Sequence, residues 1–135
     1  MGRYLIVGIV SGIVFGLLDG AINANSLGRR LNEVYQPIAR PAINVPVGLV
    51  IDLAYGLALA GLFLLMHQCL PGSIGVVKGL CYALIVWFLR VAMGSVSHAL
   101  MFRVPMQTTL YNLAAGLLEM LVLGVGYGLA LRPTA

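Results

Sequence analysis

Four ionisable side chains lie within long apolar stretches of this sequence, at Asp19, Asp52, Arg90 and Glu119. A charge inside a lipid bilayer is costly unless it is paired or faces a cavity, so such residues are candidates for binding a proton, an ion or a substrate. A carboxylate in such a place can also act as a general acid or base. The alternative is structural, because one arginine with several carboxylates can form a salt-bridge network that orders the helices.

Helical spacing indicates which polar residues accompany these four, because residues at i, i+3, i+4 and i+7 share a face of a helix. We predict a network centred on Arg90, with Asp52 and Glu119 as its partners and Asp19 above them. Three acids against one arginine leave an excess of two negative charges, which favours protonation of one carboxylate, and Glu119 is the deepest acid. The predicted intramembrane polar network consists of Asp19, Asp52, Arg90, His98, Asn112 and Glu119.

Four apolar segments must position these side chains, and each reaches the roughly 20 residues that a helix needs to cross a bilayer. Hydrophobic residues make up 61% of the 135 residues and charged residues 9%, with a mean hydropathy of +1.01. This composition excludes a soluble enzyme, a disordered tail, a coiled coil and a nucleic-acid-binding module. The sequence predicts an all-α integral membrane four-helix bundle, a single domain over 1–135 with helices at about 4–24, 43–66, 79–101 and 109–131.

The connection over 25–42 is the only long one between the predicted helices. Its apolar residues recur at helical spacing, which favours a short amphipathic helix in the headgroup region, and an ordinary loop is the alternative. The residues in this pattern are Leu27, Leu31, Val34 and Tyr35.

Cap residues and tyrosines mark where the helices end. Asn44 followed by Pro46 is typical of an N-cap and first turn for the second helix, and Thr108 or Thr109 is a candidate cap for the fourth. Tyrosines are enriched where a membrane meets water. With four helices both termini share one face, and the predicted interfacial tyrosines are Tyr4, Tyr82 and Tyr127 near that face and Tyr35 and Tyr111 near the opposite one.

Glycine repeats every four residues in two of the predicted helices. Such ridges of small residues let helix backbones approach closely in membranes. The interpretation left open is whether they pack the bundle itself or form a face for self-association. The repeats are Gly8, Gly12, Gly16 and Gly20 in the first helix and Gly124 and Gly128 in the fourth.

Basic residues flank the helices almost equally on the two faces, which indicates anchoring at the membrane edge rather than nucleic-acid binding. The face with the termini carries Arg3, Lys78 and Arg132, and the opposite face carries Arg29, Arg30, Arg40 and Arg103. The positive-inside rule then favours the second face as cytoplasmic by one residue and leaves dual topology open.

Motifs for catalysis or metal binding are absent from the sequence. There is no GxSxG, HExxH or P-loop, and His67 and His98 fall in different leaflets, so we expect no metal site and no cofactor. Cys69 and Cys81 form no CxxC pair and are interpreted as buried thiols.

Two short stretches resemble segments of uncharacterised small bacterial membrane proteins with four spans. They are Leu17-Leu18-Asp19-Gly20 with Asn23, and Ala115-Gly116-Leu117-Leu118-Glu119. The resemblance covers two of the four helices. It implies a four-helix fold in a bacterial inner membrane and brings no activity with it.

Three functions are compatible with these patterns. The first expectation is a non-enzymatic structural or accessory protein held together by the Arg90 network and docked through the glycine ridge. The first alternative is a homo-oligomeric carrier or channel that uses Asp52, Arg90 and Glu119 for a proton or small ion. The second alternative is an enzyme acting on a lipid-soluble substrate, with Glu119 or Asp52 working near Asn112. The expected partners are the lipid bilayer and either further copies of the chain or another membrane protein.

Overall fold

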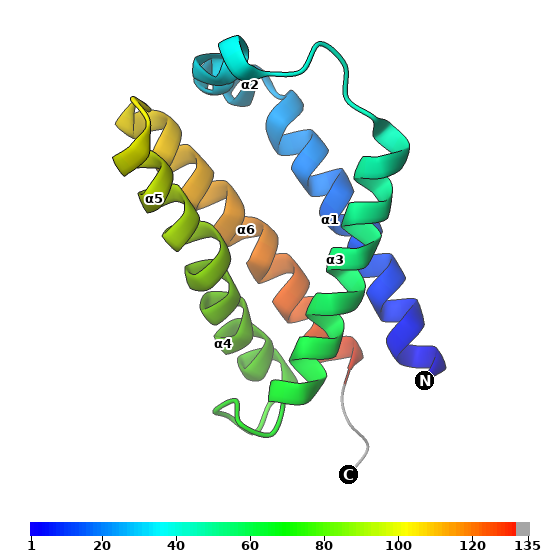
Figure 1. Cartoon of the computed structure of the whole chain (residues 1–135). Coiled ribbons are helices and arrows are strands. Elements are labelled where there is room, and N and C mark those ends of the chain that lie inside the picture. Colours follow the sequence, from blue (N-terminus) through cyan, green and yellow to red (C-terminus); the bar gives the residue numbers. More distant parts are fainter. Residues whose placement is uncertain (132–135) are drawn as a thin grey trace.

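The computed structural model describes residues 1–131, and its regular secondary structure is all helical, with no strand in that range (Figure 1). Four helical stretches are long and apolar enough to cross a membrane: Gly2–Ala24, Val45–Met66, Gly75–Met101 and Met106–Ala130. They comprise α1 (Gly2–Ala24), α3 (Val45–Met66), α4 (Gly75–Trp87) with α5 (Met93–Met101), and α6 (Met106–Ala130). The all-helical fold with four such helices is confirmed. The largest difference from prediction is the start of the third, at Gly75 rather than residue 79.

The third helical stretch is not one continuous α-helix. A π-helical segment, η2 (Phe88–Ala92), joins α4 to α5, and the Met93 amide donates to the Phe88 carbonyl five residues earlier. A π-helical turn holds an extra residue and is often found at functional sites. Arg90 is the central residue of η2. The side chains of α5 are therefore rotated relative to those that an unbroken α-helix would present.

The long connection contains helix α2 (Ser26–Asn32) followed by a 3₁₀ segment, η1 (Glu33–Ile38). The favoured prediction of a helix in this connection is therefore confirmed over residues 26–38, and its position in the headgroup region stays a prediction. The Asn25 side chain caps α2 by accepting a hydrogen bond of 2.7 Å from the Gly28 amide.

The predicted caps had different outcomes. Asn44 caps α3 as predicted, accepting from the Val47 amide at 3.3 Å. The predicted threonine cap of the fourth helix is wrong, because α6 begins at Met106 after Pro105. Thr108 instead donates to the Leu31 carbonyl at 2.7 Å. Its hydroxyl therefore fastens α2 to α6.

The four long stretches pair as two hairpins, α1 with α3 and α4 with α6. In the first hairpin Gly56 of α3 packs against the backbone of Gly8 and Gly12. A Cβ atom at Gly12 would come within 2.7 Å of the Asp52 carbonyl oxygen. Such backbone contact between small residues is the usual means of joining helices in a membrane, where lipid is as apolar as the side chains.

The second hairpin is joined in the same way. Gly79 of α4 lies against the backbone of Gly124, and Gly128 lies against that of Gly75. In α1, by contrast, the space around Gly20 is open, since a Cβ atom added there would have no neighbour within 4 Å. The glycine ridges are thus used for packing within the chain, except at this position.

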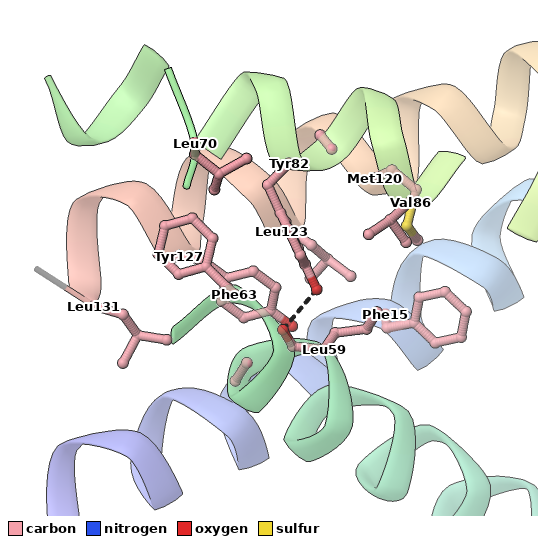
Figure 2. Close-up of a cluster of buried hydrophobic side chains, with 12 residues drawn as sticks. Phe15, Leu59, Phe63, Leu70, Tyr82, Val86, Met120, Leu123, Tyr127 and Leu131 are labelled. Atoms are coloured by element: carbon pink, nitrogen blue, oxygen red, sulfur yellow. Dashed lines mark hydrogen bonds between the residues drawn. The ribbon is translucent and has the colours of Figure 1, made fainter. Parts of the chain in front are cut away.

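A buried apolar cluster joins the two hairpins at the end that holds the N-terminus (Figures 1 and 2). Phe63 of α3 packs against the rings of Tyr82 and Tyr127, at centroid distances of 5.3 and 5.9 Å, and the two tyrosine rings also contact each other. The Tyr82 hydroxyl donates to the Leu59 carbonyl at 2.7 Å, and the Tyr127 hydroxyl donates to Ser11 Oγ at 2.9 Å. The interfacial placement predicted for Tyr82 and Tyr127 is therefore wrong, since both rings are almost fully buried.

At the opposite end the hairpins separate, and α2 lies over the gap (Figure 1). Tyr111 links α6 to the end of α1. Its hydroxyl donates to the Ile22 carbonyl at 2.8 Å and accepts from the Asn25 side chain at 2.9 Å. The molecule is therefore packed tightly at one end and braced by α2 at the other. Arg132, counted among the basic residues of the terminal face, lies outside the described residues.

The glycine contacts predict different outcomes for one substitution at two positions of α1. Gly12→Ala inserts a methyl group into the α1–α3 backbone contact, so we expect it to lower stability by about 1–3 kcal/mol. Gly20→Ala adds a methyl group in open space and is expected to be neutral or stabilising by up to about 1 kcal/mol. Thermal unfolding in detergent, followed by circular dichroism, measures both. Equal melting temperatures for the two variants would contradict the packing described here.

Candidate functional site

A cavity of about 460 Å³ lies between the hairpins at the α2 end of the molecule. All four long helical stretches contribute to its wall, and Tyr35 of η1 adds to it from the connection. We call this cavity the polar crevice. Its polar lining side chains are Asp19, Asn23, Tyr35, Tyr55, Arg90, Ser95, His98, Thr109, Asn112 and Glu119.

The crevice brings together five of the six residues in the predicted polar network. These are Asp19, Arg90, His98, Asn112 and Glu119. The sixth, Asp52, does not line the crevice. Its Oδ2 atom lies where α1 and α3 pack, 2.6 Å from the position that a Cβ of Gly16 would take.

Arg90 is held by aromatic rings. Its guanidinium carbon is 4.8 Å from the ring centroid of Phe15 and 4.8 Å from that of Tyr55. Cation–π contacts of this kind partly replace the hydration that the charge loses. Within residues 1–131 no carboxylate oxygen lies within 4.0 Å of the guanidinium nitrogens. The direct pairing with Asp52 and Glu119 that the sequence suggested is thus replaced by a two-ring contact.

Glu119 is the most deeply buried acid of the crevice, with 5% of its surface exposed. No side chain or amide in the described part of the chain donates to its carboxylate, and since no fully buried side-chain oxygen there lacks a partner, its oxygens are open to the crevice. One turn earlier, Gly116 lets α6 approach Val91 of η2, where a Cβ would lie 2.6 Å from a Val91 methyl group. This close contact places Glu119 beside the helix segment that carries Arg90.

The mouth of the crevice is formed by polar side chains near the ends of the helices. The Asn23 amide donates to Asp19 Oδ1 at 3.2 Å, and the Asn32 amide of α2 donates to Asn23 at 3.2 Å. His98 of α5 packs edge-on against Phe102, with centroids 5.7 Å apart. The connection between α1 and α3 therefore helps to shape the entrance.

The inner end of the crevice is closed by the apolar cluster. Beyond Arg90 and Glu119, the next inward-facing residues are Val86, Met120 and Leu123, which are 7%, 2% and 4% exposed. These side chains belong to the same buried cluster as Phe63 and Tyr82 (Figure 2). The crevice is consequently accessible from one end of the molecule and ends near its middle.

The aromatic residues around Arg90 were not predicted from the sequence as functional residues. Phe15 precedes Asp19 by four residues and Tyr55 follows Asp52 by three, so each shares a helix face with an acid. That spacing was the available signal. Nothing comparable indicates the π-helical segment, because no proline or glycine lies within Phe88–Ala92.

No three His, Cys, Asp or Glu side chains gather as metal ligands among residues 1–131. The interpretation of both cysteines as buried thiols is wrong for Cys69, which is exposed, while Cys81 is partly buried.

No protein-family model, curated protein or solved structure matches this chain.

The crevice predicts where water reaches the third helical stretch. In a background with Cys69→Ser and Cys81→Ala, we expect Ser95→Cys to react with a charged methanethiosulfonate reagent, because Ser95 lines the crevice. Val96→Cys, one residue later at an outward-facing position, is expected to react at least ten times more slowly, since a thiol in lipid does not ionise. The measurement is the labelling rate in membranes by mass spectrometry. Similar rates at both positions would rule out a water-accessible crevice.

Proposed function

We propose that this chain is a membrane carrier that binds a small polar solute in the polar crevice and couples its release to proton uptake by Glu119. One observation carries the proposal. A carboxylate that is 5% exposed, with no hydrogen-bond partner in residues 1–131, lines a polar crevice between four helices able to span a membrane.

The coupling follows from the cost of charge in a membrane. A carboxylate at the depth of Glu119 is stable when a proton or a positively charged group neutralises it. Both occupy the same oxygens, so binding of one displaces the other. Binding of the solute and binding of a proton are therefore mutually exclusive at this site.

The geometry favours this proposal over the structural or accessory role. In that role the charged residues would hold the helices together as ion pairs. Helix packing in residues 1–131 is supplied instead by glycine contacts and by hydroxyl groups donating to carbonyls, as at Gly56 and Tyr82. The volume of the crevice, about 460 Å³, would also admit the substrate of a membrane enzyme, which needs roughly 300 Å³ or more.

Alternating access requires a part of the molecule that can bend. The π-helical segment Phe88–Ala92 lies between α4, which packs tightly on α6, and α5, which contacts it less. We propose that α5 pivots at this segment as the two hairpins close over the solute. The tightly packed end would then open on the other side.

We place the protein in a bacterial inner membrane with the mouth of the crevice toward the cytoplasm. Four arginines are carried by the connections at that end, and basic residues favour the cytoplasmic side. They are Arg29, Arg30, Arg40 and Arg103. Large apolar side chains remain exposed along the helices, and we propose lipid and a second copy of the chain as their partners.

Solute-driven proton movement tests the proposal. The protein is reconstituted in liposomes that contain a pH-sensitive dye, and amino acids, amines, carboxylic acids, sugars and inorganic ions are added outside. We expect at least one solute class to change the internal pH. Glu119→Gln should reduce this rate at least tenfold, because an amide cannot take up the proton.

The matched control is Glu33→Gln, since Glu33 is an acid of η1 outside the crevice and is exposed. It should keep the wild-type rate. The carrier function is refuted if no solute moves protons, or if Glu119→Gln transports with unchanged proton coupling.

A further inference from the structure

We infer that the solute of the polar crevice is a small organic zwitterion, with an anionic group bound by Arg90 and a cationic group bound by Glu119. The inference rests on the proposed function and deepens it, because it names the class of solute for the same site. It follows from two opposite charges that line one cavity without pairing with each other.

The first step concerns the anion side of the site. Phe15 and Tyr55 both contact the guanidinium of Arg90 over their ring faces, at 4.8 Å. No side chain or carbonyl in residues 1–131 accepts a hydrogen bond from the N–H groups of this guanidinium, so they remain available to a ligand in the crevice. A guanidinium edge held in place in this way binds a carboxylate through two parallel hydrogen bonds.

The second step concerns the cation side. Glu119 is more than nine-tenths buried and lines the crevice without a partner in the described residues. Asn112 lies two turns earlier on the same face of α6, and Thr109 lies three residues before Asn112. A carboxylate, an amide oxygen and a hydroxyl on one wall provide acceptors for the several N–H groups of an ammonium ion.

Charge complementarity excludes solutes with only one kind of charge. A simple cation at Glu119 would share the crevice with the positive charge of Arg90, and a simple anion at Arg90 would share it with Glu119 and Asp19. Like charges in one poorly hydrated cavity repel each other strongly. A zwitterion neutralises Arg90 and Glu119 at once, which is also what the interior of a membrane favours, while Asp19 is exposed and keeps its contact with water.

The size of the crevice favours an organic solute over a single inorganic ion. Its volume of about 460 Å³ falls in the range of roughly 300–1,000 Å³ that is usual for sites of small organic molecules. Non-polar lining residues such as Val91 and Ile22 can contact a short carbon chain between the two charged groups. Amino acids and compounds of similar size and charge therefore fit the site.

Binding by the purified full-length protein in detergent tests the solute class. The probes are the twenty common L-amino acids, β-alanine, γ-aminobutyrate and taurine. Isothermal titration is carried out for each, and the best ligand is then compared with its amide, which keeps only the cation, and its N-acetyl derivative, which keeps only the anion. We expect each single-charge analogue to bind at least ten times more weakly than the zwitterion.

Two variants assign the two ends of the ligand. Arg90→Gln should abolish the preference for the zwitterion over its amide, and Glu119→Gln should abolish the preference over its N-acetyl derivative. Arg29→Gln and Glu33→Gln change the same residue types outside the crevice and should bind as the wild type does. If a crevice variant fails to fold, the comparison of analogues on the wild type still decides the question.

The inference is overturned if no zwitterion of the panel binds, or if a single-charge analogue binds as tightly as its parent. These results are distinct from failure of the carrier function. A simple cation that binds and moves protons would keep the carrier and overturn the zwitterion. A zwitterion that binds in detergent but moves no protons in liposomes would keep the solute class and overturn the carrier.

Discussion

Close contact between glycine backbones is the constraint on which the rest of this structure depends. Gly56 against Gly8 and Gly12, and Gly79 against Gly124, hold each hairpin at a separation that no larger side chain allows. In a membrane, lipid contacts apolar side chains as favourably as another helix does. Close backbone packing is therefore what favours helix–helix contact over helix–lipid contact. Because the apolar cluster joins the hairpins at one end only, they can separate at the other. The polar crevice is the space that this separation leaves.

The crevice then determines how the internal charges are accommodated. Arg90 lies against the adjoining rings of Phe15 and Tyr55, and Glu119 remains without a protein partner among residues 1–131. Direct ion pairing would have neutralised both groups and closed the space between them. The two rings keep the charge in place while the N–H groups of the guanidinium remain able to bind. The π-helical segment places Arg90 in an irregular turn of the helix, and such turns are often found at functional sites.

The parts of the fold that were predictable are those that depend on neighbours along the chain. Helix length and apolar composition identified the four long helices, and Asn44 with Pro46 identified the start of α3. Local sequence patterns were less informative where a side chain forms a hydrogen bond with a residue that is distant in the sequence. Thr108 donates to Leu31 rather than capping α6, and Tyr127 donates to Ser11 rather than lying at an interface. In both cases the hydroxyl donates a hydrogen bond to an acceptor that cannot be identified from the sequence.

Sequence alone determined the helices, the glycine ridges and the presence of ionisable groups among them, because each depends on composition and on the 3.6-residue period of one helix. Helical phase also identified Asp19, Arg90, His98, Asn112 and Glu119 as residues of common orientation, and these line the crevice. Only the tertiary structure decided that Asp52 lies outside it and that aromatic rings hold Arg90. The reason is that phase gives the direction of a side chain around its own axis, whereas partners depend on how the helices are rotated and separated relative to one another. In this chain the π-helical turn sets the rotation of α5, and the glycine contacts set the separation of the helices within each hairpin.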